Sequence, residues 1–403
     1  ITNYQVGAPN SSKLEAVFSM CAYSPDDVGS EFTLLEVETK SDFTNGSTSS
    51  REINCLAARV QTRASKVVDG WDFTTGSFLY WFSDAILSDF LDLLGEAKTL
   101  KILDLDSLYV AMSDVPSTLK QFHYSYDDAD ISLGQRIATA CNAARVGAYR
   151  EGQIWRFYRE ESKPVTFHFD RRNIAGNAES QMSFRFQKPN DHDSVRLSYI
   201  DPDDNKERHI ERKINVGLGT FETGIGERPL EIDLAGCRNT TQAVNRAELE
   251  VRRLVYQRRT VSERVLSDGL LVDIGDRVRW ACIYDGDIVD GEVLEVSGTQ
   301  VRISEKLRVS GSLIGHITDI NGDVHGPYSV SAGSNGDFWI NGFDITKAFV
   351  ANNMPAQLGS RVIIGTTENL DYYDFTVTSK TPNTDGTVQI EMIEYNELMF
   401  SED

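Results

Sequence analysis

Alternation of apolar and polar residues with a period of two is the feature that most limits what this chain can fold into. Five segments show it: 53–57, 165–169, 182–186, 195–199 and 388–392. Such alternation places apolar side chains on one face of a β-strand. Residue pairs that suit hairpin turns recur along the chain, at Asn45-Gly46, Asp285-Gly286, Asn321-Gly322 and Asp385-Gly386. The sequence therefore predicts a β-dominated chain with many hairpins.

Three stretches have the 3.6-residue period of an amphipathic helix instead. Each begins at a residue that commonly caps helix N-termini: Ser83, Ser132 and Asn239. Gln135 lies three residues after Ser132, which is the spacing of a capping box. Gly95 is expected to end the first helix. We therefore expect three helices set among the strands.

Length and shifts in composition predict several domains. At about 150 residues per domain, 403 residues suggest two or three. Shifts at 78–83 and 306–314 suggest boundaries, which leads to four expected segments: β-rich 1–80, α+β 81–170, β-rich with one long helix 171–310, and β-rich 311–403. The expected fold is mainly β with α+β insertions, in small barrel-like or sandwich-like domains with discontinuous boundaries.

The balance of charge excludes some classes of partner. Lys and Arg together number 40 and Asp and Glu 61, so the formal net charge is −21. Proteins that read nucleic-acid sequence draw affinity from clustered Lys and Arg, and such a protein is not expected here. No apolar run reaches the roughly 18 residues of a membrane-spanning helix. The chain begins at Ile1 with no signal-peptide pattern after it, so we expect that its start is missing or was processed.

Cysteine usage favours a reducing compartment. The five cysteines are odd in number and far apart, without a C-x-x-C pair: Cys21, Cys55, Cys141, Cys237 and Cys282. A disulfide framework or zinc site normally needs closer or paired spacing. We therefore expect reduced, buried thiols in a protein folded in cytosol.

One segment matches the opening of a calcium-binding loop. Asp201, Asp203 and Asn205 alternate as the first ligands of such a loop do. Lys206 then stands where the turn glycine should be, and Arg212 where a bidentate glutamate should close the site. We therefore interpret this segment as a polar turn between two strands.

Other candidate acid–base or metal-binding residues have structural interpretations. Three aspartates precede the second helix, where the helix dipole favours acids: Asp127, Asp128 and Asp130. The six histidines lack metal-ligand spacing and are expected to be isolated surface or turn residues: His123, His168, His192, His209, His316 and His325. No P-loop or nucleophile elbow occurs, and no helix is expected after Gly224-Ile225-Gly226.

Basic and aromatic clusters also have structural interpretations. Five arginines lie on and just after the third helix: Arg246, Arg252, Arg253, Arg258 and Arg259. Glu248 and Glu250 lie among them, which favours an exposed, salt-bridged surface over a phosphate site. Core packing is expected for the aromatic residues in strand patterns: Trp71, Tyr80, Trp81, Trp155 and Trp280.

The order of segments from residue 78 onward is more informative than any single motif. The succession is 78–83, 104–109, 122–126, the helix 134–144, the hairpin 147–155, 195–202, 232–239, the helix 243–253, 274–278 and 390–396. This succession resembles the hub region of the tail-tip proteins of long-tailed bacteriophages, the lambda-type host-specificity or tip attachment protein J family. Members of that family usually have a longer N-terminal portion, and many continue into receptor-binding modules. The receptor-binding part is therefore expected outside this chain.

The resemblance implies a structural virion protein at the tail tip. It implies a homotrimeric baseplate hub that closes the tail tube and contacts the distal tail protein, other tail-tip proteins and the tape-measure protein. It also implies folding and assembly in the bacterial host cytoplasm, a part in host attachment, and passage of DNA during genome ejection without specific binding. An acidic trimer would adhere weakly to phosphate. The family supplies no catalytic, cofactor or metal residues, and no trimer-interface residues, so we expect no enzymatic activity and no cofactor.

Two alternatives remain open from the residues alone. A tail-associated enzyme that cleaves glycan or peptidoglycan would require two carboxylates about 5 to 10 Å apart in a cleft. A secreted β-rich adhesin would be a monomer. A cleft lined by carboxylates distinguishes the first alternative from the hub, and oligomeric state distinguishes the second.

Overall fold

The computed structural model describes residues 61–68, 70–77, 80–110, 112–126, 131–169, 173–175, 192–215, 220–280, 288–298, 300–306, 311–333, 338–350, 359–366 and 374–400. Several predictions made from the sequence concern residues outside these ranges. They are the alternating segments 53–57 and 182–186, two turn pairs (Asn45-Gly46 and Asp285-Gly286), the three aspartates Asp127, Asp128 and Asp130, and the cysteines Cys21, Cys55 and Cys282.

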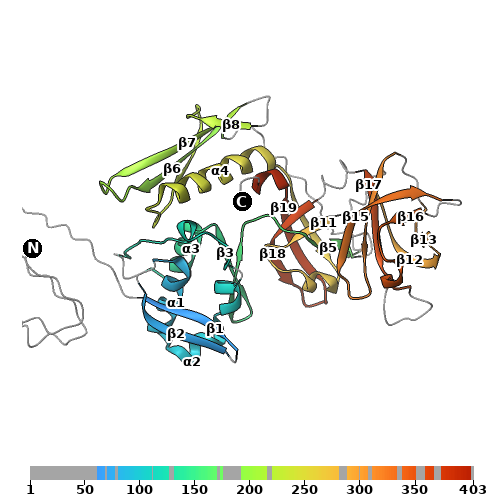
Figure 1. Ribbon diagram of the computed structural model, residues 1–403, viewed down its shortest axis with the longest axis horizontal. Coiled ribbons are helices and arrows are strands. Elements are labelled where there is room, and N and C mark those ends of the chain that lie inside the picture. The colour runs from blue at the N-terminus through green and yellow to red at the C-terminus, as the bar shows by residue number, and fades with distance from the viewer. Residues whose placement is uncertain are drawn as a thin grey trace, which may run out of the picture. The chain divides into compact units, whose positions relative to one another are not determined.

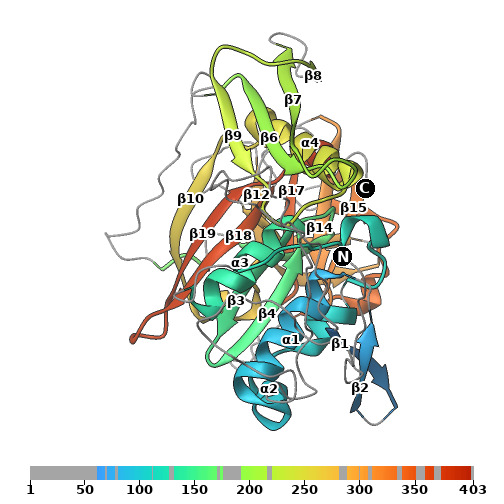
Figure 2. The same ribbon diagram turned by 90° about the vertical axis from the view of Figure 1, so that its left-hand side faces the viewer.

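A five-stranded sheet joins strands from distant parts of the chain. Its order is β10 (Thr260–Val265), β19 (Val388–Glu394), β18 (Asp374–Pro382), β11 (Arg277–Trp280) and β5 (Val165–Phe169). Figure 2 shows β10, β19 and β18 side by side. All neighbours are antiparallel except β11 and β5, which are parallel. The predicted strands at 165–169 and 388–392 are thereby confirmed. Gly386 adopts φ 83° in the turn between β18 and β19, which confirms the predicted hairpin there.

The inner face of this sheet is apolar, as alternation predicts. Phe169, Val278, Phe375 and Ile390 are fully buried in one cluster. The residues between them along each strand point to the opposite face, which we call the outer face. Ile174 forms a bridge to Val265 of β10, so the chain that leaves β5 reaches the far edge strand of the same sheet.

A closed six-stranded barrel is inserted between β11 and β18 (Figure 1). Its strand order is β12 (Val289–Ser297), β13 (Gln300–Ile303), β16 (Phe338–Asn341), β15 (Val324–Ala332), β14 (Leu313–Thr318) and β17 (Arg361–Thr366). The predicted turn at Asn321-Gly322 joins β14 to β15, with Gly322 at φ 91°. The expected boundary at 310 falls between β13 and β14 of this one barrel, and the five-stranded sheet surrounds the barrel in sequence. The expected discontinuous, multidomain and mainly β fold is therefore confirmed.

A four-stranded sheet has a long helix packed on it (Figure 1). The strand order is β8 (Thr220–Thr223), β7 (Glu207–Asn215), β6 (Ser194–Ile200) and β9 (Pro229–Asp233). Helix α4 (Thr240–Tyr256) contacts β6 and β7. The Asn239 side chain accepts a hydrogen bond from the amide of Thr241 at 2.9 Å, which confirms the predicted cap. As expected, Gly224-Ile225-Gly226 leads into strand β9 rather than a helix.

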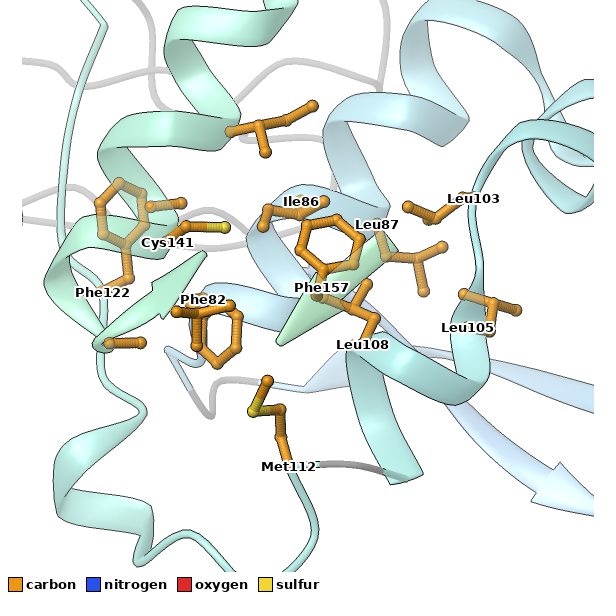
Figure 3. Close-up of a cluster of buried hydrophobic side chains, with 14 of the residues drawn as sticks. Phe82, Ile86, Leu87, Leu103, Leu105, Leu108, Met112, Phe122, Cys141 and Phe157 are labelled. Carbon is orange, nitrogen blue, oxygen red and sulfur yellow. The ribbon is translucent and has the colours of Figure 1, made fainter. Parts of the chain in front are cut away.

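Helices and two hairpins surround a further core (Figure 3). The helices are α1 (Phe82–Leu94), α2 (Glu96–Ile102), a π-helix η2 (Asp106–Val110) and α3 (Leu133–Ala143); the hairpins are β1 (Gln61–Val67) with β2 (Gly70–Ser77), and β3 (Val146–Glu151) with β4 (Ile154–Arg159). Phe82, Leu87 and Phe157 are among the buried residues at its centre. Short 3-10 turns complete the described elements: η3 (Ser117–Leu119), η4 (Ser267–Leu271), η6 (Ile345–Lys347) and η7 (Glu397–Phe400).

The helices confirm two predicted starts and correct one. The capping box of Ser132 and Gln135 is formed at the start of α3. Ser83, by contrast, lies inside α1 and is buried, and the N-cap Trp81 makes no side-chain hydrogen bond. The helix begins one residue before Ser83 because Phe82 is anchored in the core. Gly95 ends α1 as expected, but α2 follows it directly and was not predicted. Among the described helices, none has the length and apolar composition needed to cross a membrane.

Candidate functional site

Five charged residues form a network where hairpin β3–β4 meets α4. Glu160 follows β4, and its carboxylate contacts Nη2 of Arg253 at 2.6 Å and Nη1 of Arg246 at 3.6 Å. Glu250 lies 2.9 Å from Nη2 of Arg246 and 2.8 Å from Nη1 of Arg253. Arg145 donates from Nη2 to the Glu160 carbonyl oxygen at 2.8 Å. We call this set, Arg145, Glu160, Arg246, Glu250 and Arg253, the charged junction.

The electrostatics of the charged junction favour the ionised form of Glu160. Burial by itself would raise the pKa of Glu160, but the guanidinium groups of Arg253 and Arg246 outweigh it, and the pKa of this carboxyl is lowered. Burial would likewise lower the pKa of Arg253, yet the Glu160 and Glu250 carboxylates raise it. The Glu160 side chain is 24% exposed. The ionised Glu160 carboxylate and the Arg253 guanidinium therefore stabilise each other.

A second charged cluster lies on the outer face of the five-stranded sheet. Asp374 at the start of β18 is 1% exposed and accepts hydrogen bonds from two arginines of β11. Arg277 Nη2 lies 2.6 Å from Oδ2 of Asp374, and Arg279 donates from Nε to Oδ1 at 2.6 Å and from Nη2 to Oδ2 at 2.8 Å. The Arg277 guanidinium also lies 4.1 Å from the ring centre of Tyr395. We call Arg277, Arg279 and Asp374 the Asp374 cluster.

A pocket of about 210 Å³ separates the two charged sets. It is lined by the end of β4, the end of α4 and the outer face of the sheet: Tyr158, Arg159, Glu160, Glu161, Lys163, Arg253, Gln257, Gly275, Arg277, Thr376, Thr378, Ile393, Tyr395 and Phe400. Lys163 donates from Nζ to the Gly275 carbonyl oxygen at 3.2 Å. Burial lowers the pKa of Lys163, although Asp276 and Glu161 act to raise it. The pocket thus has both charged and aromatic residues in its walls.

The Tyr158 ring fixes how closely the hairpin approaches the sheet. A Cβ atom added to Gly275 would lie 2.3 Å from Cδ2 of Tyr158, and one added to Gly147 would lie 2.3 Å from its Cζ. Gly275 also has φ 92°, a left-handed conformation that favours glycine. The two glycines therefore let a tyrosine ring fill the space between hairpin and sheet.

The structure corrects the predicted character of the arginine cluster. Salt bridges are confirmed: Arg252 lies 3.8 Å from Glu248, and Arg259 lies 2.6 Å from Glu394. The expected exposure is wrong for Arg252 and Arg259, which are buried, and for Arg246, whose side chain is only 11% exposed, whereas Arg258 is exposed as predicted. Helix periodicity gave no sign that a separate hairpin, ending at Glu160, covers Arg246 and Arg253. Arg252 instead packs over the Phe221 ring of β8, on the sheet that α4 itself covers, and Arg259 follows α4 and pairs with Glu394 of β19.

The structure also corrects the prediction for two histidines. His168 on β5 is 1% exposed and His316 on β14 is 5% exposed, so neither is a surface or turn residue. Their ring centres are 5.5 Å apart at an interplanar angle of 65°. Each lies in a strand where alternation alone would assign it to an outward face. The contact between barrel and sheet buries them.

The acidic turn between β6 and β7 confirms its structural interpretation. The Asp201 carboxylate accepts the amide of Asp203 at 2.9 Å, and Asn205 adopts φ 53°. Arg208 pairs with Asp204 at 2.9 Å. Within the described part of the chain, no group of three or more His, Cys, Asp or Glu residues is arranged to hold a metal ion.

The predictions for cysteines and aromatic residues are confirmed only in part. Cys141 and Cys237 are free and buried, as predicted, and burial raises the pKa of Cys237 to about 11. Trp280 is fully buried in the core of the five-stranded sheet. Trp71 and Trp155 pack at the edge of the helical core. Tyr80 is exposed, which contradicts the core role expected for it.

Sequence reasoning missed Glu160, Arg145 and Asp374. Their partners lie far away in sequence, so no local spacing indicates the pairs. One weak signal exists: in residues 277–280 arginine alternates with Val278 and Trp280, which indicates a strand with a charged face opposite an apolar one. The charged outer face of β11 could have been predicted from that pattern, but not its partner.

Comparisons with known proteins give loose similarities of fold. No family model and no curated protein matches the chain. A solved structure of the virion of a native gene transfer agent particle is similar with a TM-score of 0.44 and 11% identity, over 79% of this chain and 48% of that chain. A tail protein from Neisseria meningitidis MC58 is similar with a TM-score of 0.32 and 13% identity, over 55% of this chain and 67% of that chain. The chain spans about half the length of the first. Scores this low assign neither a family nor a function.

Proposed function

We propose that this chain is a structural component of a bacteriophage tail tip, the central hub that closes the tail tube. Three copies form a ring that contacts the distal tail protein, other tail-tip proteins and the tape-measure protein. DNA passes through the ring without specific binding. Host attachment involves parts outside this chain.

The observation that carries the proposal is the convergence in space of the segments that resemble the hub family. The amide of His123 donates to the Gly236 carbonyl oxygen at 2.8 Å. The Gln242 side chain of α4 donates to the carbonyl oxygens of Gln121 at 2.9 Å and Ala143 at 2.7 Å. Hydrogen bonds therefore tie the segment 122–126 to 232–239, and the helix 134–144 to 243–253 through Arg246, which donates to the Asn142 carbonyl oxygen at 3.5 Å; Gln242 and Gln121, each one residue before a segment, connect the two pairs.

The C-terminal segment of the resemblance joins the same framework. Glu394 in β19 accepts the amides of Arg258 at 2.9 Å and Arg259 at 3.1 Å, just after α4. Tyr395 lines the pocket beside the charged junction. An ordered set of segments that also forms one connected framework supports a shared architecture better than sequence order does by itself.

The use of charge also supports a structural role. The general acid of a glycan-cleaving enzyme has a raised pKa, so that it stays protonated until it donates its proton. Glu160, one of the two glutamates that line the pocket, has a lowered pKa instead, because Arg253 and Arg246 stabilise its ionised form. We therefore propose that the chain acts through assembly and opening rather than through bond chemistry.

The mass of the particle in solution tests the hub proposal. We expect sedimentation equilibrium of the full chain to give three times the mass of the 45.1 kDa chain at high concentration. Images of the particle should show a three-fold ring. A monomer at every concentration, alone and with the distal tail protein added, contradicts the trimeric hub.

Two further measurements test parts of this proposal: an assay for the enzyme alternative and a map of the surface charge of the ring. Release of soluble fragments from purified peptidoglycan would favour the enzyme. A ring whose lumen is strongly basic would contradict passage of DNA without adhesion, because clustered Lys and Arg hold phosphate.

A further inference from the structure

Two imidazoles meet where the barrel contacts the five-stranded sheet. His168 belongs to β5, an edge strand of the sheet, and His316 belongs to β14 of the barrel. Their rings are in edge-to-face contact, with centres 5.5 Å apart. The His168 side chain points to the outer face of the sheet, between Phe167 and Phe169 of the inner core. The contact therefore joins two bodies of the fold rather than stabilising one of them.

The His168 ring has unused hydrogen-bonding capacity. Neither Nδ1 nor Nε2 has a partner among the described residues, although both atoms are buried. A neutral imidazole has one donor and one acceptor, whereas a protonated one has two donors and a charge. A buried charge without an acceptor costs much more than a buried neutral ring. The site as built accommodates only the neutral form well.

The surroundings of the pair are basic. The charged and titratable groups of the packed elements are Arg277 and Arg279 on β11, Asp374 on β18, Arg361 on β17, Asp290 on β12, Asp268 on η4 and His325 on β15. Arg279 is opposite His168 in the parallel pairing of β11 with β5. Each acid in this set already contacts another group: Asp374 is shared by Arg277 and Arg279, and Asp268 pairs with Arg361. A proton on either histidine would therefore meet arginines without gaining a carboxylate.

We propose that His168 and His316 form an acid-sensitive latch, which holds the barrel on the five-stranded sheet only while both imidazoles are neutral. The remaining bonds across this contact are polar as well. Arg361 of the barrel donates to the Asn173 side chain and to Asp268. Ile363, which pairs with His316, is also buried, with Ile314 packed against it, so the two imidazoles and the ion pairs lie beside apolar side chains on this face of the barrel.

The direction of the pH effect follows from proton linkage. Burial, then the neighbouring arginines, lower the pKa of His316 to about 3, and burial and His316 lower that of His168. Once the barrel separates, both rings return to their ordinary pKa of about 6.5. The separated state therefore binds more protons below that value. Docking is complete above about pH 7 and weakens by up to tenfold per pH unit for each histidine as the pH falls below about 6.5.

Hydrogen exchange of the full chain tests the latch. Backbone exchange in peptides that cover β5 and β14 is measured from pH 7.5 to pH 5, with correction for the intrinsic exchange rate. The wild type should lose protection in these strands as the pH falls. A double variant, His168→Phe with His316→Phe, should keep its protection, because neither side chain can take a proton. The matched control is His209→Gln on exposed β7, which should behave as the wild type does.

A second measurement uses the wild type alone, so it tests the latch even if the double variant does not fold. Deuterium exchange at the imidazole C2 position of the wild type reports the protonation midpoint of each histidine. The midpoints of His168 and His316 should lie well below the ordinary imidazole value of about 6.5. Midpoints of about 6.5 for His168 and His316, or loss of protection in the double variant to the same degree as in the wild type, would overturn the latch.

Discussion

Single residues at the meeting point of hairpin and sheet carry constraints that their own neighbours in sequence do not reveal. Gly275 meets two constraints: its backbone is left-handed, and the Tyr158 ring lies too close for a side chain at this position. Glu160 balances two arginines of a helix almost one hundred residues away. Substitution at these positions should therefore cost more than local structure suggests.

Replacement of Gly275 by alanine separates the two constraints. Strain at positive φ should cost about 1 kcal/mol, and displacement of the Tyr158 ring a further 1–3 kcal/mol or so. Gly386 has a similar φ of 83° but open space around it, so Gly386→Ala should show the strain alone. Urea unfolding of both variants measures the difference. Equal losses of stability would show that the ring contact is unimportant.

Removal of the Glu160 charge should destabilise the fold strongly. Glu160→Gln leaves Arg253 and Arg246 without their shared carboxylate, at a cost of about 3 kcal/mol in the free energy of unfolding. In the exposed pair Glu295–Arg302, both side chains are more than half exposed. Glu295→Gln is the control and should cost below about 1 kcal/mol.

The pH dependence of the same variant has a definite sign. The pKa of Glu160 is lowered in the folded protein, so its contribution is complete above its ordinary pKa of 4.5 and is lost as the pH falls through the folded value. The stability difference between wild type and Glu160→Gln should therefore shrink in acid. A difference that stays constant down to pH 3 would argue against an ionised Glu160.

Among the elements, helix caps show where local pattern suffices. The α3 cap was predictable because Ser132 and Gln135 interact only with each other and with the first turn. The start of α1 was not, because the tertiary environment of Phe82 outweighs the capping preference of Ser83. Helix α2 was missed because it is only seven residues long and begins directly after Gly95, the glycine that ends α1.

Loss of the α3 cap should have a modest cost. Ser132→Ala removes the acceptor for the Gln135 amide, and we expect a loss of about 1 kcal/mol in the free energy of unfolding with an unchanged dependence on urea. Ser117→Ala, at an exposed position in η3, is the control and should change stability little. If both substitutions have the same effect, the capping box does not contribute.

At the scale of the whole molecule, the barrel is an insertion whose ends meet. Arg279 in β11 is paired in register with Asp374 in β18, although 94 residues separate them. The five-stranded sheet therefore does not need the barrel to bring these two strands together. Sheets of this kind accept or lose inserted domains where entry and exit are adjacent.

Excision of the barrel tests this view of the fold. Replacement of residues 281–373 by a short Asn-Gly turn should leave a protein that unfolds cooperatively and keeps its β-sheet circular dichroism. Its stability should be lower, since Arg361 no longer contacts Asn173 and Asp268. A product without a cooperative transition would mean that sheet and barrel fold as one unit.

The sequence by itself determined the features that depend on neighbours within a few residues. Those are the strands at 165–169, 195–199 and 388–392, the turns at Asn321-Gly322 and Asp385-Gly386, two helix caps, and the mainly β, multidomain class. Tertiary structure alone decided which distant groups meet: Glu160 with Arg253, Asp374 with two arginines, and His168 with His316. The physical reason is that backbone periodicity is a local property. Burial of a charged or titratable side chain depends on which other part of the chain covers it.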